Sequence, residues 1–325
     1  MHTDRAWGAA VAQTIAESQF AAALQVAQDS AASTEERAEM LMEIAMGLQS
    51  KPKCIQQLHD AVTLYERALQ QNPGPLLSAR IRSRMGTALQ SIPDEGGASL
   101  KRARDCFESV LPELRDVGRP EEVAEVELNL GLTIQSLAGL GLARIQDAIQ
   151  RYHHALRVFH RETHPQEFAI LHNNLAIAYL AIPATDERAR MREALAVQSF
   201  EEVLKVISLI DHPSEYAMIQ NNLGNALQYA ATGHSLENNL RALAAYEEAL
   251  KVRNPRDTPV EYANTIANMA NVLSNLEESS ATDVSSRERA LCLYGEAREL
   301  FERHGLAERA ELMTAAIAAI TGAGA

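Results

Sequence analysis

The 325-residue sequence predicts an all-α fold, an α-solenoid of about six helical hairpins with a capping element at each end. Two recurring phrases predict this fold. The first phrase reads Pro, any residue, Glu, an aromatic residue or Val, Ala, four residues, Asn, then Leu or Met and a small residue. It begins at Pro120, Pro165, Pro213 and Pro259, so its starts lie 45, 48 and 46 residues apart. Repeats of roughly 20 to 50 residues are typical of solenoids.

The second phrase lies between copies of the first and places Tyr or Phe four residues after an Ala, with Ala or Val three residues later. Offsets of four and seven put these side chains on one stripe of a helix, where Ala permits close approach and the ring fills the gap. Its six copies are Ala61/Tyr65/Ala68, Ala103/Phe107/Val110, Ala148/Tyr152/Ala155, Ala196/Phe200/Val203, Ala242/Tyr246/Ala249 and Ala290/Tyr294/Ala297.

The chain starts with a segment, residues 1–34, in which Trp7, Val11, Ile15, Phe20 and Leu24 recur at near-helical spacing. We expect capping helices there. A solenoid of about six repeats then covers residues 35–304, divided as 35–74, 75–119, 120–164, 165–212, 213–258 and 259–304.

Each repeat has an A helix around the first phrase and a B helix around the second. Pro opens the A helix, at a position where its missing N–H costs little. The first phrase weakens toward the N-terminus, where Arg84 replaces Asn before Met85-Gly86 and only Met46-Gly47 remains further back. Such decay is expected near the end of a repeat array, where the neighbours differ.

The last segment, residues 305–325, predicts a C-terminal capping helix with Leu312, Ala316 and Ile320 on one face, followed by a frayed tail. No stretch rich in Pro, Gly and Ser divides the repeats. The sequence therefore favours one continuous domain, since each repeat of a solenoid needs only its neighbours.

The formal net charge of −13 disfavours nucleic acid and anionic membranes as partners. Three cysteines in separate repeats, Cys54, Cys106 and Cys292, have no zinc or redox spacing and suit a reducing compartment, with buried thiols as the preferred interpretation. No signal peptide or membrane span is recognisable, so we expect a cytoplasmic protein.

No catalytic signature is recognisable in the sequence. His153, His154, His160 and His164 form the densest histidine group, which we interpret as surface residues at a helix end because no further ligands follow them at metal-binding spacing. The chain has no phosphate-binding Gly loop, nucleophile elbow or dinucleotide fingerprint. We expect no enzymatic activity, no metal and no cofactor.

The Ala/aromatic/Ala stripe and the Leu-Gly element resemble the tetratricopeptide repeat (TPR) over residues 36–304. With about 46 residues per unit instead of the usual 34, the match is to a long-hairpin variant. The segments 141–149 and 213–224 look like bacterial TPR arrays found beside caspase-like CHAT peptidase domains. The repeats use nearly the whole chain, so no peptidase function is inferred. The resemblance implies a right-handed superhelix whose concave wall of A helices binds peptides or proteins.

The resemblance also implies a set of groove residues, because TPR domains that hold a peptide's C-terminal carboxylate project Asn, Lys and Arg from their A helices. The position just before the Leu-small pair, here named the ladder position, is one of these. It is occupied by Arg84, Asn129, Asn174, Asn222 and Asn268. Arg80 matches a second such position and Asn225 and Asn271 a third, while Asn173 and Asn221 add polarity beside the ladder.

Two interpretations of the ladder remain open. Asn amides offer a donor and an acceptor to an extended peptide backbone, and the pair Arg80/Arg84 could grip a carboxylate in bidentate fashion. Alternatively, the amides join neighbouring helices and fix the packing of the repeats without any ligand. Ile44 and Leu48 stand where a carboxylate clamp would place Lys and Asn, which argues against a C-terminal carboxylate as the ligand.

The sequence thus predicts a non-enzymatic scaffold, adaptor or assembly chaperone that binds a protein or peptide partner in the groove of a superhelix. A regulatory sensor, in which the superhelix binds a peptide or small effector and controls a partner protein, is the alternative. The identity of the partner and the oligomeric state are left open.

Overall fold

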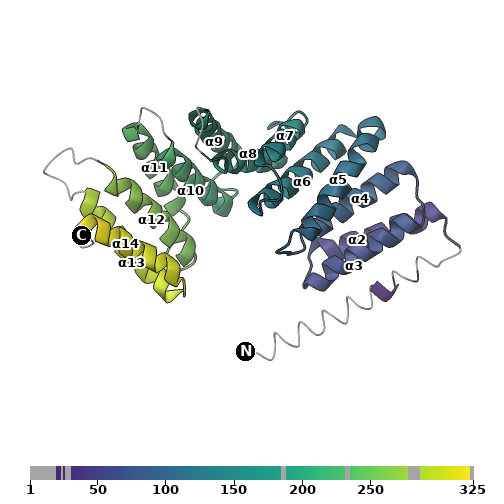
Figure 1. The fold of residues 1–325 in the computed structure, drawn as a ribbon, viewed down its shortest axis with the longest axis horizontal. Helices are drawn as coiled ribbons and strands as arrows, with labels where there is room; N and C mark the ends of the chain where they lie inside the picture. Colours follow the sequence, from purple (N-terminus) through teal and green to yellow (C-terminus); the bar gives the residue numbers. More distant parts are fainter. Residues whose placement is uncertain are drawn as a thin grey trace, which may run out of the picture. The chain divides into compact units, whose positions relative to one another are not determined.

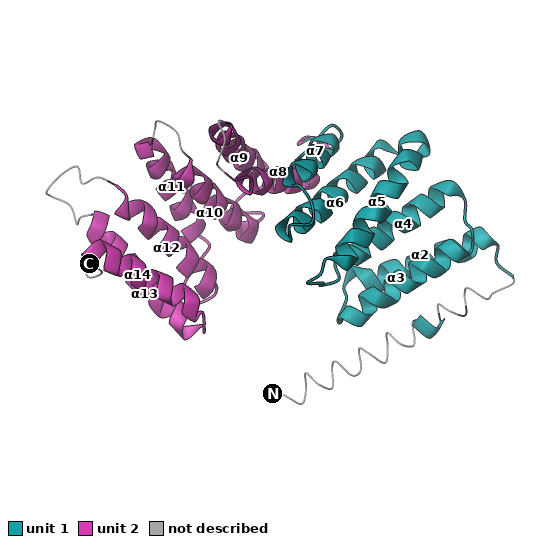
Figure 2. Cartoon of the chain, in the orientation of Figure 1, with its two compact units in different colours: residues 1–160 teal, residues 161–325 magenta. Residues whose placement is uncertain are grey.

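The computed structural model describes residues 20–22, 25, 31–183, 188–230, 235–276 and 286–322, and these residues form helices and no strand. Figure 1 shows the helices following one another as hairpins. The chain divides into two compact units, residues 1–160 and 161–325, coloured separately in Figure 2. The predicted all-α, hairpin-based solenoid arrangement is confirmed.

The described part of residues 1–160 contains three hairpins in which an A helix packs on the following B helix, and the first two B helices also pack on the next A helix. The helices are α2 (Thr34–Ser50), α3 (Ile55–Gln70), α4 (Pro75–Gln90), α5 (Ala98–Val117), α6 (Pro120–Gly139) and α7 (Ile145–Ala155).

Residues 161–325 contain three more hairpins built in the same way, and a final helix, α14, packs on α13. The helices are α8 (Pro165–Leu180), α9 (Ala189–Leu204), α10 (Pro213–Tyr229), α11 (Ser235–Leu250), α12 (Pro259–Ser274), α13 (Ser286–Arg303) and α14 (Ala307–Thr321).

Proline opens five of the A helices, α4, α6, α8, α10 and α12, in their first turn, as predicted. In α2 a capping box takes its place. The Ser33 hydroxyl accepts the Glu36 N–H at 3.2 Å, and the Glu36 carboxylate accepts the Ser33 N–H at 2.7 Å. Both devices deal with N–H groups that the first helical turn leaves without partners.

All eighteen residues of the second phrase are buried, as the periodicity predicts. The rings fit because the facing residue of the A helix is small. A Cβ added to Gly131 would lie 2.5 Å from the Tyr152 ring, and one added to Gly224 would lie 2.5 Å from the Tyr246 ring. Glycine at these two positions is therefore a requirement of close helix packing.

The buried tyrosines find their hydrogen-bond partner at a fixed place, four residues after the small residue of the A helix. The hydroxyl of Tyr152 donates to Gln135 at 2.8 Å, and that of Tyr246 donates to Gln228 at 3.1 Å and to Asn225 at 2.8 Å. In the repeat where Phe200 replaces Tyr, the equivalent residue is Leu180. The repeat with Phe107 nevertheless keeps Gln90 at this place. Each of these buried tyrosine hydroxyls thus has an acceptor, because a buried hydroxyl without a partner is costly.

The same rule corrects the alignment of the first repeat. Tyr65 donates to Gln49 at 2.7 Å, which makes buried Ala45 the small residue, whereas nothing lies within 4 Å of a Cβ added to Gly47. The sequence-based alignment, which took Met46-Gly47 as the remaining Met-small pair of the first phrase, was therefore wrong by two residues. With Ala45 in register, Glu43 occupies the ladder position of α2.

Two further expectations were wrong. Cys54 and Cys292 are exposed and Cys106 is half-buried, because none of them lies on the inner stripe of its helix. Leu312 is exposed, and α14 instead packs Met313, Ala316, Ile317 and Ile320 against the core. The expected N-terminal capping helices in residues 1–34, including Trp7, lie largely outside the described residues.

No helix within the described part of the chain is long and apolar enough to cross a membrane.

Candidate functional site

The predicted groove residues all lie on A helices. Residues 1–160 contribute Arg80 and Arg84 from α4 and Asn129 from α6. Residues 161–325 contribute the rest, which are Asn173 and Asn174 on α8, Asn221, Asn222 and Asn225 on α10, and Asn268 and Asn271 on α12.

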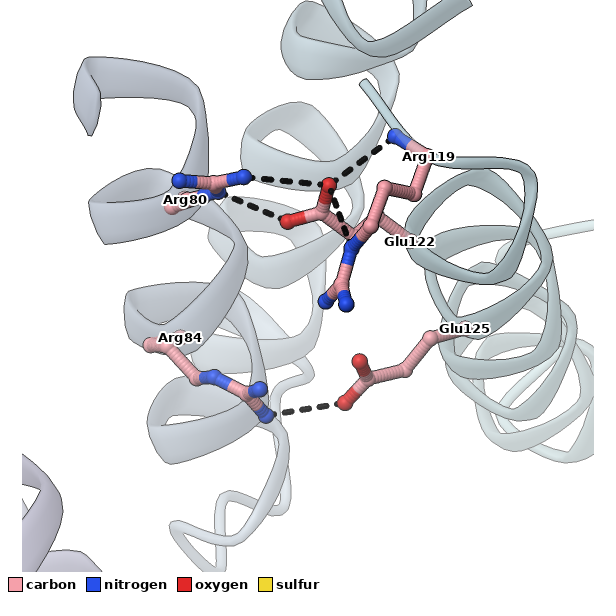
Figure 3. Close-up of polar contacts among 5 residues, drawn as sticks. All are labelled: Arg80, Arg84, Arg119, Glu122 and Glu125. Carbon is pink, nitrogen blue, oxygen red and sulfur yellow. Dashed lines mark hydrogen bonds and ion pairs between the residues drawn. The ribbon is translucent and has the colours of Figure 1, made fainter. Parts of the chain in front are cut away.

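The arginine pair of α4 is held by carboxylates of α6 (Figure 3). Arg80 donates from Nε to Glu122 Oε1 at 2.7 Å and from Nη2 to Oε2 at 3.3 Å, and Arg84 donates from Nη1 to Glu125 Oε1 at 2.8 Å. Glu122 also accepts the backbone N–H of Arg119 at 3.0 Å. A peptide carboxylate at this place would have to displace two carboxylates of the protein itself.

The electrostatics of Glu122 reflect this arrangement. Its side chain is only 14% exposed, and hydrogen bonding to Arg80 lowers the pKa of its carboxyl to about 2. The same bond raises the pKa of the Arg80 guanidinium. The pair remains fully ionised at neutral pH and bridges successive A helices.

Four of the asparagines make hydrogen bonds to another helix. Asn268 Nδ2 donates to Asn221 Oδ1 on the preceding A helix at 3.4 Å, and Asn271 Nδ2 donates to the Tyr229 hydroxyl at 3.3 Å. Asn225, as described above, accepts from a core tyrosine. These contacts are of the packing kind that the second interpretation of the ladder requires.

The other ladder amides are engaged less with neighbouring helices. Asn174 Nδ2 donates to the carbonyl of Ile170 in its own helix at 2.8 Å. Asn129 and Asn222 are half-buried, and within the described chain their side chains make no hydrogen bond. The amides of Asn129 and Asn222 thus retain a donor and an acceptor for a ligand.

Asn173 differs from all of these because its Oδ1 atom is buried and has no hydrogen-bond partner within the described residues. An unpartnered buried acceptor of this kind costs about 1–3 kcal/mol. It borders a small apolar pocket of about 110 Å³ between α8 and α10, the α8/α10 pocket. Its lining includes Ile170, Asn173, Ile207, Glu215, Met218 and Ile219.

A second polar feature, which the sequence did not predict, is a buried carboxylate on α6. The side chain of Glu127 is 3% exposed and contacts Arg115 of α5 at 2.7 Å, Arg151 of α7 at 3.2 Å and His154 of α7 at 3.4 Å. The arrangement ties three helices together, and a pocket of about 290 Å³ lies beside it. This cluster around Glu127 forms only because α5 and α7 approach the same point of α6, so no local sequence pattern predicts it.

The remaining histidines give no metal site. His160 is exposed, and partial burial together with the neighbouring His154 lowers the pKa of His153. Across the described ranges, no group of three His, Cys, Asp or Glu side chains could hold a metal ion.

Comparison with known proteins supports the fold class. No family model and no curated protein matches the sequence. Among solved structures, the chain is similar to BtubC (BKLC) from P. vanneervenii with a TM-score of 0.52 and 18% identity, over 84% of this chain and 94% of that chain. A likeness at this identity shows the fold alone. The fold defines this chain as a helical-repeat protein.

Proposed function

We propose that this chain is a non-enzymatic TPR-type binding module, a cytoplasmic scaffold, adaptor or assembly chaperone that holds a peptide segment of a partner protein along its A helices. The observation that carries the proposal is the half-buried amide at the ladder position, which recurs within each of the two units. Asn129 and Asn222 make no hydrogen bond within the described chain, and Asn174 bonds only to its own helix.

Such amides suit an extended polypeptide, which presents N–H donors and carbonyl acceptors in alternation. Asn has a mediocre helix propensity, so its return at this position needs a reason beyond helix formation. A preformed row of helices would also lower the ordering cost of binding on the side of this protein.

The test is affinity capture by the immobilised full-length protein from its native cell, followed by mass spectrometry. We expect one partner in near-stoichiometric amount, and we expect the variant Asn174→Ala/Asn222→Ala to lose it. Gln198→Ala provides the matched control, because it removes an exposed amide from the B helix α9 in the same unit.

Two results would overturn the proposal. One is capture of no specific partner. The other is retention of the partner by a folded Asn174→Ala/Asn222→Ala variant at the affinity of the wild type.

A further inference from the structure

Three pairs of successive A helices within one unit, in which both helices begin with proline, present the same groove position, and the repeat register lets them be compared residue by residue. The pairs are α4/α6 in residues 1–160, and α8/α10 and α10/α12 in residues 161–325. The first and the last of these positions are closed by arginine side chains of the protein itself. The middle one is open.

In α4/α6, the groove is crossed by the two ion pairs of Figure 3, Arg80 with Glu122 and Arg84 with Glu125. The residues in register on α8 are Ile170 and Asn174, which cannot form these pairs. Glu215, in register with Glu122, accordingly has no ion pair within the described chain.

In α10/α12, the groove is closed by Arg253. Its Nη1 donates to Thr265 Oγ1 at 2.7 Å and to the Glu261 carbonyl at 3.4 Å. The amides of Asn221 and Asn268 meet beside it at 3.4 Å.

Backbone hydrogen bonds support the residue-by-residue alignment of the α8/α10 groove with the α10/α12 groove. Ile207 N–H donates to the carbonyl of Val203 at 2.9 Å just as Arg253 N–H donates to that of Ala249 at 3.0 Å. Where α10/α12 has Arg253 and Thr265, α8/α10 therefore has Ile207 and Ile219, two aliphatic residues that leave the α8/α10 pocket open. Asn173 is in register with Asn221, but Asn222, the residue in register with Asn268, makes no hydrogen bond to it.

The open pocket thus holds two groups without partners within the described chain. The Asn173 Oδ1 atom has no donor, unlike Asn221 Oδ1 in α10/α12, and Glu215 has no cation, unlike Glu122 in α4/α6. Ile170 and Met218, 45% and 41% exposed, extend its apolar surface to the solvent. An apolar cavity of roughly 150 Å³ accepts a benzene molecule, so a pocket of about 110 Å³ suits one aliphatic side chain.

We propose that the α8/α10 pocket binds an extended peptide segment of the partner in which one aliphatic residue is flanked by arginine or lysine. The aliphatic side chain enters between Ile207 and Ile219, a main-chain N–H of the peptide donates to Asn173 Oδ1, and a flanking cation pairs with Glu215. This inference rests on the proposed function and adds the chemistry of the ligand to it.

The charge of this part of the chain agrees with such a ligand. Residues 161–325 carry 14 Lys and Arg against 23 Asp and Glu, a formal charge of −9. A basic segment would be attracted, whereas an acidic one would be repelled.

The test uses the full chain and fluorescein-labelled peptides that differ only in a five-residue centre. The centres are Arg-Arg-Leu-Arg-Arg, Arg-Arg-Ala-Arg-Arg and Glu-Glu-Leu-Glu-Glu, each flanked by Gly-Ser, and binding is followed by fluorescence anisotropy at physiological salt. We expect the Leu peptide to bind about tenfold more tightly than the equally charged Ala peptide. We expect no measurable binding of the acidic peptide.

Two variants test whether the preference for the Leu peptide arises in the α8/α10 pocket. Ile207→Arg/Ile219→Thr copies the closed α10/α12 groove into α8/α10, so it should fold and should bind the Leu and Ala peptides equally. Glu215→Gln should weaken the Leu peptide about two- to fivefold. Glu261→Gln, the same charge change in the closed groove, should have less than half of that effect.

Equal binding of the Leu and Ala peptides by the wild type, or an unchanged Leu/Ala ratio in a folded Ile207→Arg/Ile219→Thr variant, would overturn this inference. If a native partner is nevertheless captured and is lost in Asn174→Ala/Asn222→Ala, the proposed function stands and only the ligand chemistry is wrong. If neither peptide nor partner binds, both proposals fail.

Discussion

At the scale of single residues, the fold depends on small side chains that face rings. Gly86, Gly131 and Gly224 each lie so close to a ring of the following B helix that a Cβ would come within 2.8 Å or less of it. In two other repeats Ala176 and Ala270 take the same place and are fully buried. The helices of a hairpin therefore approach as closely as these residues permit.

Gly224→Ala should destabilise the protein by about 1–3 kcal/mol, because the new methyl group would overlap the Tyr246 ring. Gly295→Ala in the interior of α13 is the matched control. Nothing lies within 4 Å of its Cβ position, so it should stabilise by about 0.5–1 kcal/mol through helix propensity. Urea denaturation of the full chain measures both. Equal effects of the two substitutions would contradict the packing argument.

Glu122 should give the stability a pH dependence. Its pKa is about 2 in the folded protein against an ordinary 4.5. Because the folded pKa is depressed, the ionised carboxylate stabilises the fold above pH 4.5, and this contribution is lost as the pH falls through about 2. Arg80 is 42% exposed, so solvent screening limits the contribution to about 1–2 kcal/mol.

The measurement is the free energy of unfolding of Glu122→Gln relative to the wild type, from pH 7 down to pH 2. The variant should be less stable at pH 7, and the difference should vanish toward pH 2. Glu121→Gln, in the same first turn of α6 but exposed, controls for the helix dipole. A pH-independent difference for Glu122→Gln would show that the ion pair is not its cause.

At the scale of elements, each A helix has a defined start, which is a proline in five cases and the Ser33 capping box in α2. Proline contributes by its fixed φ and needs no partner. The capping box instead depends on one hydroxyl and one carboxylate. The start of α2 is therefore the one among these six that a single side-chain truncation can weaken.

Ser33→Ala should cost about 1 kcal/mol and fray the first turn of α2, because the Glu36 N–H loses its acceptor. Hydrogen exchange of the backbone amides of residues 34–42, measured by mass spectrometry, should become faster in this variant. Ser50→Ala is the control at the other end of α2, where the hydroxyl bonds only to the carbonyl of Gly47. Unchanged exchange in Ser33→Ala would mean that the capping box does not hold the turn.

At the scale of the whole molecule, the chain consists of two compact units, each with three hairpins among its described residues. Hairpins of a repeat protein pack only on their sequence neighbours, so each unit contains the contacts that its helices need. The acidic charge is uneven, because residues 161–325 carry −9 of the total −13. A basic partner would accordingly be drawn more strongly to this unit.

The two units, expressed separately as residues 31–160 and 161–322, should both fold. Circular dichroism should show helical spectra and a cooperative thermal transition for each fragment, with the intact chain as the reference. A fragment without a cooperative transition would show that its hairpins do not suffice for folding.

The candidate site was predictable only in part. The register of the first phrase placed Asn129, Asn174, Asn222 and Asn268 on A helices, because helix position follows from local spacing. Their hydrogen-bond partners did not follow. Arg80 meets Glu122, 42 positions further on, and Asn268 meets Asn221, 47 positions back. Contacts across such separations in the sequence depend on how far successive hairpins rotate and translate relative to each other. The sequence of a single helix does not contain this information.

The sequence by itself determined the helices, their pairing into hairpins and the buried Ala/aromatic stripe, since a period of 3.6 residues is a local property that composition and spacing express directly. Only the tertiary structure decided which polar groups are satisfied within the protein. Arginines of α4 and of the link between α11 and α12 close two of the compared grooves, whereas Ile207 and Ile219 leave the third open with an unpartnered Asn173. The reason is that satisfying a buried polar atom takes a partner within about 3 Å, and in these grooves the partner comes from another repeat.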